Sequence, residues 1–319
     1  MGKIILMYGG KYRITQLNSC LRYFRTEGII LFSTKSYLLF KFIFFFFKKK
    51  VIPVFLDGKF ITGNYSKSYI LWFNTSNEIP ELKKRNKNNL FLCLDPKKDN
   101  NLFPLTTKIN SGFILKLNKN TKIVYISEVD INVNNDVKNF WNKNKNEIFN
   151  NLDLVNDISF IKKIFFTDEK ENYINYFQLK NLLRFELINF VNKYFSKNLF
   201  LVGKDWAKLG FGAQNIQYDT SFRKKSYMNS ICLDFGSKSG LNSLYPRTIE
   251  ILENKGFLLQ SKQYDSKLFK KNLPNNYDFY HSSDELLDKV NNLLNSNTEI
   301  KVENYNYLHK NFIEFLRKI

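Results

Sequence analysis

The stretch ICLDFGSKSGLNSLYPRTIEILENKGFLLQS, residues 231–261, decides the fold class of the C-terminal half of the chain. It runs from an apolar strand through a glycine-containing loop and a short helix to a second apolar strand, which is the order of a βαβ unit. Pro246 suits the first helical position, and Gly256 suits a left-handed residue after the helix end. We therefore expect two parallel strands joined by a helix.

Arg247 is the unusual residue of this stretch, because a helix N-terminus favours negative charge. A bound anion such as a phosphate, placed between the guanidinium and the helix N-terminus, would explain it. The alternative is a surface salt bridge with Glu250, three residues later. The preceding loop, 236–242, could cradle the same anion with its backbone N–H groups.

Composition bounds the class of protein. The chain has 319 residues, of which 44% are hydrophobic and 17% aromatic, and this excludes a disordered protein. The net charge of +20 favours anionic partners, namely membrane lipids or anionic polymers. Only eight of the 49 basic residues are arginine, and no zinc finger, RNP strand or arginine-rich helix is visible, so nucleic-acid binding is disfavoured.

The cysteines and histidines give no sign of a disulfide framework or a zinc site. The three cysteines are widely spaced, and the chain has only two histidines. We expect a reduced, intracellular protein that needs neither a metal nor a cofactor.

Strands and helices alternate along both halves of the chain, which predicts two α/β domains with a boundary near residue 155. The first domain, 1–155, ends in a polar stretch, 129–156, which we interpret as a solvated helix and linker. The second, 156–319, is expected to end in an amphipathic helix. The expected strands are 3–8, 29–32, 51–56, 69–73, 90–94, 112–117, 122–126, 158–166, 198–202, 231–235 and 257–261, and the expected helices are 16–24, 168–195, 246–255, 283–294 and 305–319.

One apolar run, residues 36–47, is followed directly by three lysines. It is far shorter than the ~20 residues of a spanning helix, and Lys41 interrupts it. The favoured interpretation is a buried helix leading into the strand at 51–56. The alternative is an interfacial patch that rests in the headgroup region of a membrane.

Three segments of the C-terminal half together resemble the glycosyltransferase group 1 pattern, and in particular its spore-maturation-protein-like branch. Members carry a Gly-x-x-Trp after one strand, a Tyr–Asn/Ser pair before another, and an Arg-x-x-Glu helix followed by Gly-Phe-Leu-Leu. The matching residues are Gly203 and Trp206; Tyr227, Asn229 and Ser230; Arg247 and Glu250; and 256–259. The resemblance covers about residues 158–319.

This resemblance implies the GT-B fold, in which two Rossmann-like α/β domains face a cleft and the C-terminal one holds a nucleotide-sugar donor. It also implies that helix 305–319 crosses back to the N-terminal domain, the acceptor side. Glu250 falls where the family's retaining enzymes place the second glutamate of a Glu–seven residues–Glu pair, a contact to the nucleotide ribose. The first position holds Asn242, which departs from that pattern.

The donor-binding candidates each have a structural alternative. Trp206 and Tyr245 could pack rather than contact the nucleotide, and Arg223 could belong to a solvated turn. Asp265 is a further candidate contact after the last strand of the stretch. The full candidate set is Arg247, Glu250, Gly240, Asn242, Tyr245, Gly236, Arg223, Gly203, Trp206 and Asp265.

The sequence thus predicts a cytoplasmic glycosyltransferase, peripheral at the inner face of a membrane in one interpretation. It would move a hexose-type sugar from a nucleotide-sugar to a glycan or lipid-linked acceptor in polysaccharide biosynthesis. Charge stabilisation of the departing nucleoside diphosphate is the main catalytic need, so no metal is required; the sequence identifies no general base. The alternatives are a nucleic-acid-binding protein on a Rossmann-like scaffold and a non-catalytic GT-B-like binding subunit.

Overall fold

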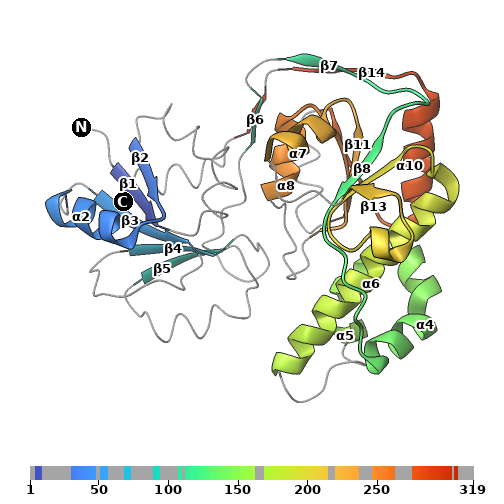
Figure 1. Cartoon of the computed structure of the whole chain (residues 1–319), viewed down its shortest axis with the longest axis horizontal. Coiled ribbons are helices and arrows are strands. Elements are labelled where there is room, and N and C mark those ends of the chain that lie inside the picture. Colours follow the sequence, from blue (N-terminus) through green and yellow to red (C-terminus); the bar gives the residue numbers. More distant parts are fainter. Residues whose placement is uncertain are drawn as a thin grey trace. The chain divides into compact units, whose positions relative to one another are not determined.

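The computed structural model describes residues 4–8, 30–47, 51–56, 68–72, 89–93, 107–109, 112–161, 169–214, 220–236, 246–262, 275–303 and 305–307. The chain forms two compact units (Figure 1). Unit 1 comprises Met1–Lys108, Leu241–Ile249 and Asn306–Ile319, and unit 2 comprises Ile109–Gly240 and Glu250–Tyr305.

Unit 1 contains a five-stranded sheet in the order β2-β1-β3-β4-β5, with every neighbouring pair parallel. Helix α2 (Tyr37–Phe47) joins β2 to β3, so the chain crosses from one side of β1 to the other. This is a doubly wound α/β arrangement, and it confirms all five strands expected here. The strands are β1 (Ile4–Tyr8), β2 (Ile30–Thr34), β3 (Val51–Leu56), β4 (Ser68–Trp72) and β5 (Asn89–Cys93).

Unit 2 contains a six-stranded parallel sheet in the order β10-β9-β8-β11-β12-β13. Numbered from β8, this order is 3-2-1-4-5-6, the strand order of the Rossmann fold. The α/β expectation is therefore confirmed in both units. The strands are β8 (Ile123–Ile126), β9 (Leu199–Val202), β10 (Ala213–Gln214), β11 (Ile231–Asp234), β12 (Phe257–Ser261) and β13 (Tyr277–Tyr280).

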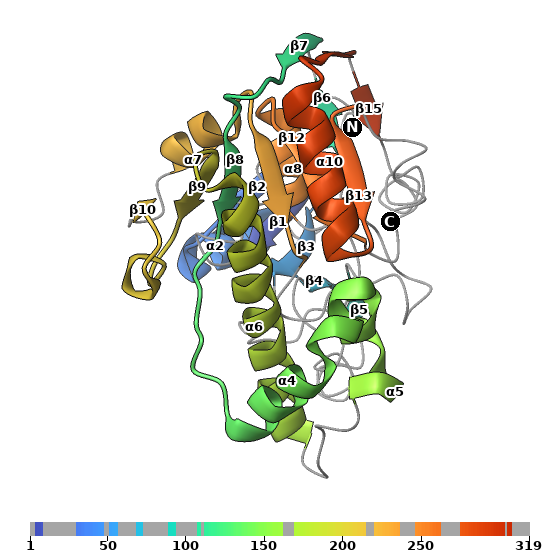
Figure 2. The same ribbon diagram turned by 90° about the vertical axis from the view of Figure 1, so that its right-hand side faces the viewer.

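Helices cover both faces of this sheet (Figures 1 and 2). On one face α6 (Glu169–Phe195) contacts α4 (Asn135–Asn150) and α10 (Ser283–Asn295), which also contact each other. On the other face α7 (Thr220–Tyr227) and α8 (Pro246–Glu253) are joined by an ion pair. Buried side chains from the strands and from α4, α6 and α10 form one core, in which Tyr125, Trp141 and Trp206 are the largest.

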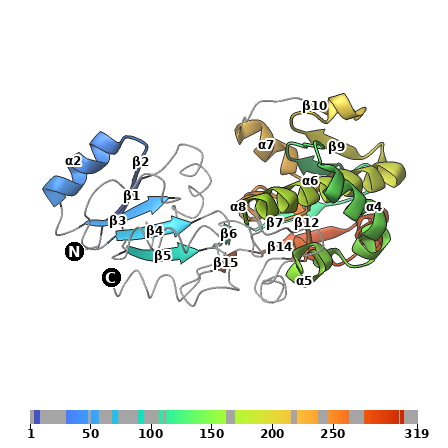
Figure 3. The same cartoon turned by 90° about the horizontal axis from the view of Figure 1, so that it is seen from below.

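The shorter elements lie in the connections (Figure 3). Two single-turn segments, η3 (Leu152–Asn156) and α5 (Ile158–Ile161), follow α4, and η5 (Ala207–Leu209) follows β9. Strand β7 (Phe113–Lys116) pairs antiparallel with β14 (Glu299–Val302), and β6 (Thr107–Ile109) pairs with β15 (Tyr305–Tyr307). Within the described ranges no helix has the length and apolarity to cross a membrane.

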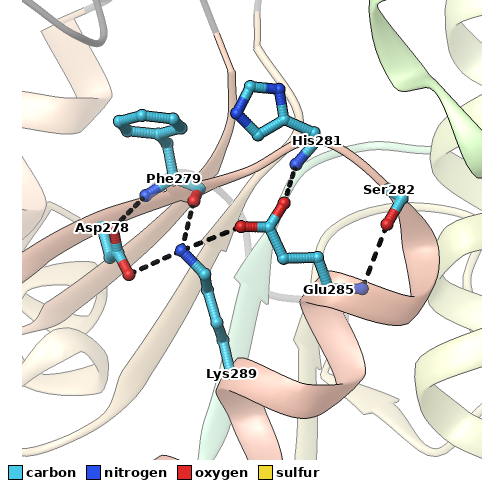
Figure 4. Close-up of polar contacts among 6 residues, drawn as sticks. All are labelled: Asp278, Phe279, His281, Ser282, Glu285 and Lys289. Atoms are coloured by element: carbon cyan, nitrogen blue, oxygen red, sulfur yellow. Dashed lines mark hydrogen bonds and ion pairs between the residues drawn. The ribbon is translucent and has the colours of Figure 1, made fainter.

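Helix α10 starts with two reciprocal caps (Figure 4). Ser282 Oγ accepts a hydrogen bond from the Glu285 N–H at 3.1 Å, and the Glu285 carboxylate accepts one from the His281 N–H at 2.7 Å. Lys289, one turn further along, bonds the Asp278 carboxylate at 2.7 Å and the Phe279 carbonyl at 2.6 Å. These bonds tie the helix to the end of β13 and close its N-terminal turn.

The segment 129–156 is part of unit 2 rather than a solvated linker. Strand β8 precedes it at the centre of the six-stranded sheet, and α4 buries Val137, Phe140, Trp141 and Ile148. The compact units divide at Lys108, so the expected boundary near residue 155 falls inside unit 2. Aromatic and aliphatic residues four and seven positions apart build a packed face here despite the surrounding asparagines and lysines.

Two expected elements differ from the structure. The strand expected at 158–166 is the short helix α5 as far as Ile161, and residues 162–168 lie outside the described residues. The helix expected at 305–319 starts instead as strand β15, and residues 308–319 lie outside the described residues, as do 16–24. The backbone of Tyr305–Tyr307 pairs with β6, so the segment starts extended rather than helical.

Gly256 has a different role from the one expected. The left-handed residue after α8 is Lys255, with φ of 61°, whereas Gly256 is not in that region. A Cβ on Gly256 would lie 2.8 Å from Ile251 Cγ2 and 2.9 Å from Cys232 Sγ. The glycine therefore allows α8 and β11 to pack closely at this point.

Candidate functional site

The candidate site is the edge of the unit 2 sheet where β8 and β11 end. From β8 the chain moves outward to β9 and β10, then returns to place β11 on the other side of β8. In doubly wound sheets, ligands bind outside the carboxyl ends of the strands at such a reversal. Ser127 follows β8 here, and Phe235 and Gly236 follow β11. We call this the switch-point edge.

Gly203 and Trp206 fix the backbone at the end of β8. Gly203 has φ of 143°, and a Cβ on it would collide with the Ser127 carbonyl oxygen and lie 2.7 Å from its carbon. The fully buried Trp206 donates its indole N–H to the same oxygen at 2.7 Å and meets Tyr125 and Phe211 edge to face. Both residues are thus held by packing within unit 2, which corresponds to the structural alternative.

Asp234 organises the end of β11. Its side chain is fully buried; Oδ1 accepts a hydrogen bond from the Gly236 N–H at 3.1 Å, and Oδ2 accepts one from Gln260 Nε2 at 2.9 Å. Gly236 has φ of 77°, which requires the freedom of glycine. The Gly236 N–H, expected as a phosphate donor, is therefore engaged by a carboxylate that fixes the start of the loop.

Two buried basic side chains lie on successive turns of α6, and one of them, Arg184, reaches the same edge. Arg184 Nη2 donates a hydrogen bond to the Gly236 carbonyl oxygen, and Lys180 Nζ donates one to Asn156 Oδ1 at 2.5 Å. The side chains lie one helical turn apart, at i and i+4, and both residues are buried. Charged residues are rarely buried to this extent without a specific partner, so the pair marks the edge as an electrostatically specialised region.

The environment of Lys180 lowers its pKa from 10.5 to about 7. Burial is the largest cause, and repulsion from Arg184 adds to it, while attraction to Asp153 opposes them. Asp153 also pairs with Lys262, which follows β12, at 2.7 Å. An anion bound beside Lys180 and Arg184 would offset their repulsion and favour the charged lysine.

Sequence reasoning missed Lys180, Arg184 and Asp234. The sequence predicts a helix at 168–195 and an apolar strand at 231–235, and neither expectation assigns a role to these three residues. One signal was present: Arg184 lies between the buried residues Leu183 and Leu187 in a chain with only eight arginines. A rare guanidinium in a leucine-rich face indicates a specific polar partner.

Arg223 and Glu250 form an ion pair between α7 and α8. Arg223 Nε and Nη2 both donate to Glu250 Oε1, at 2.9 and 2.6 Å, and both side chains are largely buried. The alternative role of Glu250 in the sequence was a salt bridge with Arg247. The structure shows a salt bridge of Glu250 with Arg223. Arg247 is the second residue of α8 and half-buried.

The remaining candidates lie outside the described residues, and the structure does not place them. They are Gly240, Asn242, Tyr245 and Asp265. Of the described candidates, Gly203, Trp206 and Gly236 meet at the switch-point edge, whereas Arg223 and Glu250 pair on the face covered by α7 and α8.

In the part of the chain that the structure describes, no three His, Cys, Asp or Glu side chains are grouped so that they could hold a metal ion. Cys232 is buried beneath α8, and burial raises the pKa of its thiol well above the ordinary value. This disfavours a thiolate and gives Cys232 a packing role.

No protein-family model matches the chain, and no curated protein matches it significantly. The geometry of the switch-point edge and the resemblance of its motifs therefore carry the functional assignment.

Proposed function

We propose that the protein is a GT-B glycosyltransferase that transfers a sugar from a nucleotide-sugar donor to a glycan or lipid-linked acceptor. The observation that carries the proposal is a sheet of Rossmann strand order with the buried Arg184 at its switch point and the buried Lys180 one helical turn away on α6. Nucleotide ligands bind at such points in doubly wound sheets. A diphosphate is the part of the donor that two neighbouring cations suit best.

In this proposal the diphosphate binds beside the loop that follows β11. Arg184 and Lys180 supply positive charge, while Asp234 holds the start of the loop. As the sugar leaves, negative charge develops on the nucleoside diphosphate, and preorganised cations stabilise it without a metal. The cost of keeping two cations close together in the empty site is offset when the anion binds.

The resemblance adds Arg247 and Glu250 to the proposed donor contacts. Both hydrogen bonds from Arg223 end on Oε1 of Glu250, so we assign Oε2 to the ribose hydroxyls. The ion pair with Arg223 would then orient the carboxylate rather than compete with the ribose.

The proposal also places the protein in the cytoplasm, peripheral at the inner face of a membrane. The charge of +20 supports this, because a basic surface is attracted to anionic lipid and to anionic polysaccharide intermediates. A lipid-linked acceptor would be met at that surface.

A thermal-shift panel of nucleoside diphosphates tests the donor site. At about 100 times its dissociation constant, the matching nucleotide should add ~2.7 kcal/mol to the free energy of unfolding. Lys180→Met should abolish the shift, and Lys145→Gln, which breaks an ion pair with Glu186 on the far side of α6, should retain it. The proposal is abandoned if no nucleoside diphosphate stabilises the protein.

A non-catalytic GT-B-like binding subunit is the second candidate. It is favoured by Asn242, which stands where retaining enzymes of the resembled family carry a glutamate. Release of free sugar or transfer from any nucleotide-sugar that binds would identify the enzyme. Tight nucleotide-sugar binding with neither reaction would identify the binding subunit.

A further inference from the structure

Helix α2 exposes an apolar face that the fold of unit 1 does not use. Among its described side chains only Phe40 is buried, whereas the fractions exposed are 80% for Leu38, 61% for Phe42 and 77% for Phe45. The expected helix before the strand β3 is confirmed, but the expectation that this helix is buried is wrong. Exposed apolar groups of this size, gathered on one helix, mark an interaction surface.

Three of the most exposed residues share one direction. Leu38, Phe42 and Phe45 follow the spacing i, i+4, i+7, and at about 100° per residue they lie within about 40° of the direction opposite Phe40. Leu39, with 48% exposed, and Phe46, with 61%, flank this stripe. We call these five residues the α2 stripe. Phe40 anchors the helix to β1, where it contacts the Tyr8 ring at 5.6 Å, so the stripe faces outward.

The segment of sequence that carries the stripe is basic. Lys35 and Lys41 are exposed, and three lysines, 48–50, follow the helix directly. Between Glu27 and Asp57 the sequence contains five lysines and no acidic residue. Lysines beside an apolar helical face can contact lipid phosphates while the apolar side chains enter the headgroup boundary.

We propose that α2 docks this protein on an anionic bilayer, lying in the plane of the interface with the α2 stripe inserted. Its 11 residues span about 16 Å, about half of the hydrocarbon thickness, so the helix lies on the membrane and does not cross it. The lysines select anionic lipids, and the stripe supplies apolar burial. This inference rests on unit 1 alone and does not depend on the donor site.

Charge favours a bilayer over a second copy of the chain as the occupant. In a two-fold dimer the stripe would face its own copy, and the same five lysines would approach each other. Each copy also carries a net charge of +20, which adds repulsion. An anionic membrane provides the opposite charge and an apolar phase in one surface.

Vesicle flotation tests the proposal, with the full chain and vesicles of neutral phosphatidylcholine or of a mixture with phosphatidylglycerol. Wild type should float with the anionic vesicles, and its binding should weaken with salt. A variant with Leu38→Gln, Phe42→Gln and Phe45→Gln should bind at least about tenfold more weakly. The matched control combines Ile114→Thr and Met228→Gln, two exposed apolar residues of unit 2, and should bind as wild type does.

A second variant, Phe45→Trp, keeps the stripe apolar and gives an optical readout. Its tryptophan emission should shift to the blue when anionic vesicles are added. Equal flotation of the wild type and the glutamine variant, or an unshifted Phe45→Trp spectrum, overturns the proposal. The proposal is also overturned if the wild type is a dimer that does not float with vesicles and the glutamine variant is a monomer. That result would assign the α2 stripe to self-association. Nucleotide binding of the glutamine variant should be unchanged, so failure here is distinct from failure of the proposed function.

Discussion

Arg184, in the middle of α6, donates a hydrogen bond from Nη2 to the carbonyl oxygen of Gly236, two residues beyond the end of β11. The bond links the helix between β8 and β9 to the loop that leaves β11, across the point where the strand order reverses. Gly236 in turn donates its N–H to Asp234, so its peptide groups are held from both sides. This arrangement fixes the backbone where a nucleotide is expected.

Arg184→Met should weaken both folding and nucleotide binding. The variant leaves a buried carbonyl without this donor, which costs about 1–3 kcal/mol of unfolding free energy. It also removes a proposed phosphate contact, and this should lower the affinity for the nucleoside diphosphate at least about tenfold. Urea unfolding measures the first effect and isothermal calorimetry the second. Destabilisation with unchanged affinity would show that Arg184 is structural only.

The stability of the protein should depend on pH through Lys180. Its pKa is about 7 in the folded state and 10.5 in the reference state, so between these values the unfolded chain binds the extra proton. Unfolding free energy therefore rises with pH from about 7 to about 10.5, by at most on the order of 5 kcal/mol from this group. Below pH 7 Lys180 is charged in both the folded and the unfolded state, so the folded state carries the full free-energy cost of the buried charge.

Lys180→Met removes this contribution and keeps the length of the side chain. The difference in unfolding free energy between wild type and variant should shift in favour of the wild type between pH 7 and pH 9, as measured by urea unfolding. The other titrating groups are common to both proteins and cancel in the difference. A difference that is constant over this range would contradict the assigned pKa shift.

Gly203→Ala should be one of the most destabilising glycine substitutions in the chain. The added Cβ meets the Ser127 backbone, and φ of 143° is unfavourable for any L side chain, so we expect a loss above about 3 kcal/mol. Gly210→Ala tests backbone strain alone, because its φ is 83° with nothing within 4 Å, and should lose about 1 kcal/mol. Gly212→Ala, which has neither constraint, should be close to neutral. Equal thermal stability of the three variants would contradict this order.

The sequence predicted the five strands of the unit 1 sheet and strands β8, β9, β11 and β12 of unit 2, because short apolar runs between polar connections are a local signal. It did not predict β10 and β13. Residues 231–261 illustrate this: the order strand, loop, helix, strand and the start at Pro246 are confirmed. The exposure of α2 was not predictable, because apolarity indicates burial without specifying what covers each face. The prediction for segment 129–156 was wrong for the opposite reason. The four buried side chains of α4 are separated in sequence by asparagines and lysines, so the segment has a polar composition although one face of its helix is packed.

The candidate site was predicted less well, because its key contacts join residues far apart in sequence. Arg184 and Gly236 are 52 residues apart, and Lys180 and Asn156 are 24 apart. No local pattern in the sequence encodes such pairs. The strand order that creates the switch point is likewise a property of the folded sheet and not of any single segment. Gly203 and Trp206 were identified as motif residues, but their shared contact with the Ser127 carbonyl is a tertiary feature.

Glu250 and Arg223 allow the ribose contact to be separated from the ion pair. If Glu250 only supports packing between α7 and α8, Glu250→Ala and Arg223→Ala should affect nucleotide affinity equally. If Oε2 contacts the ribose, Glu250→Ala should lower the affinity at least about tenfold more than Arg223→Ala, because only one of them removes a ligand contact. Calorimetric titration of both variants and of the double variant gives the comparison. The double-mutant cycle should also return a coupling energy of about 1 kcal/mol in unfolding, which confirms that the ion pair exists in solution independently of the ligand.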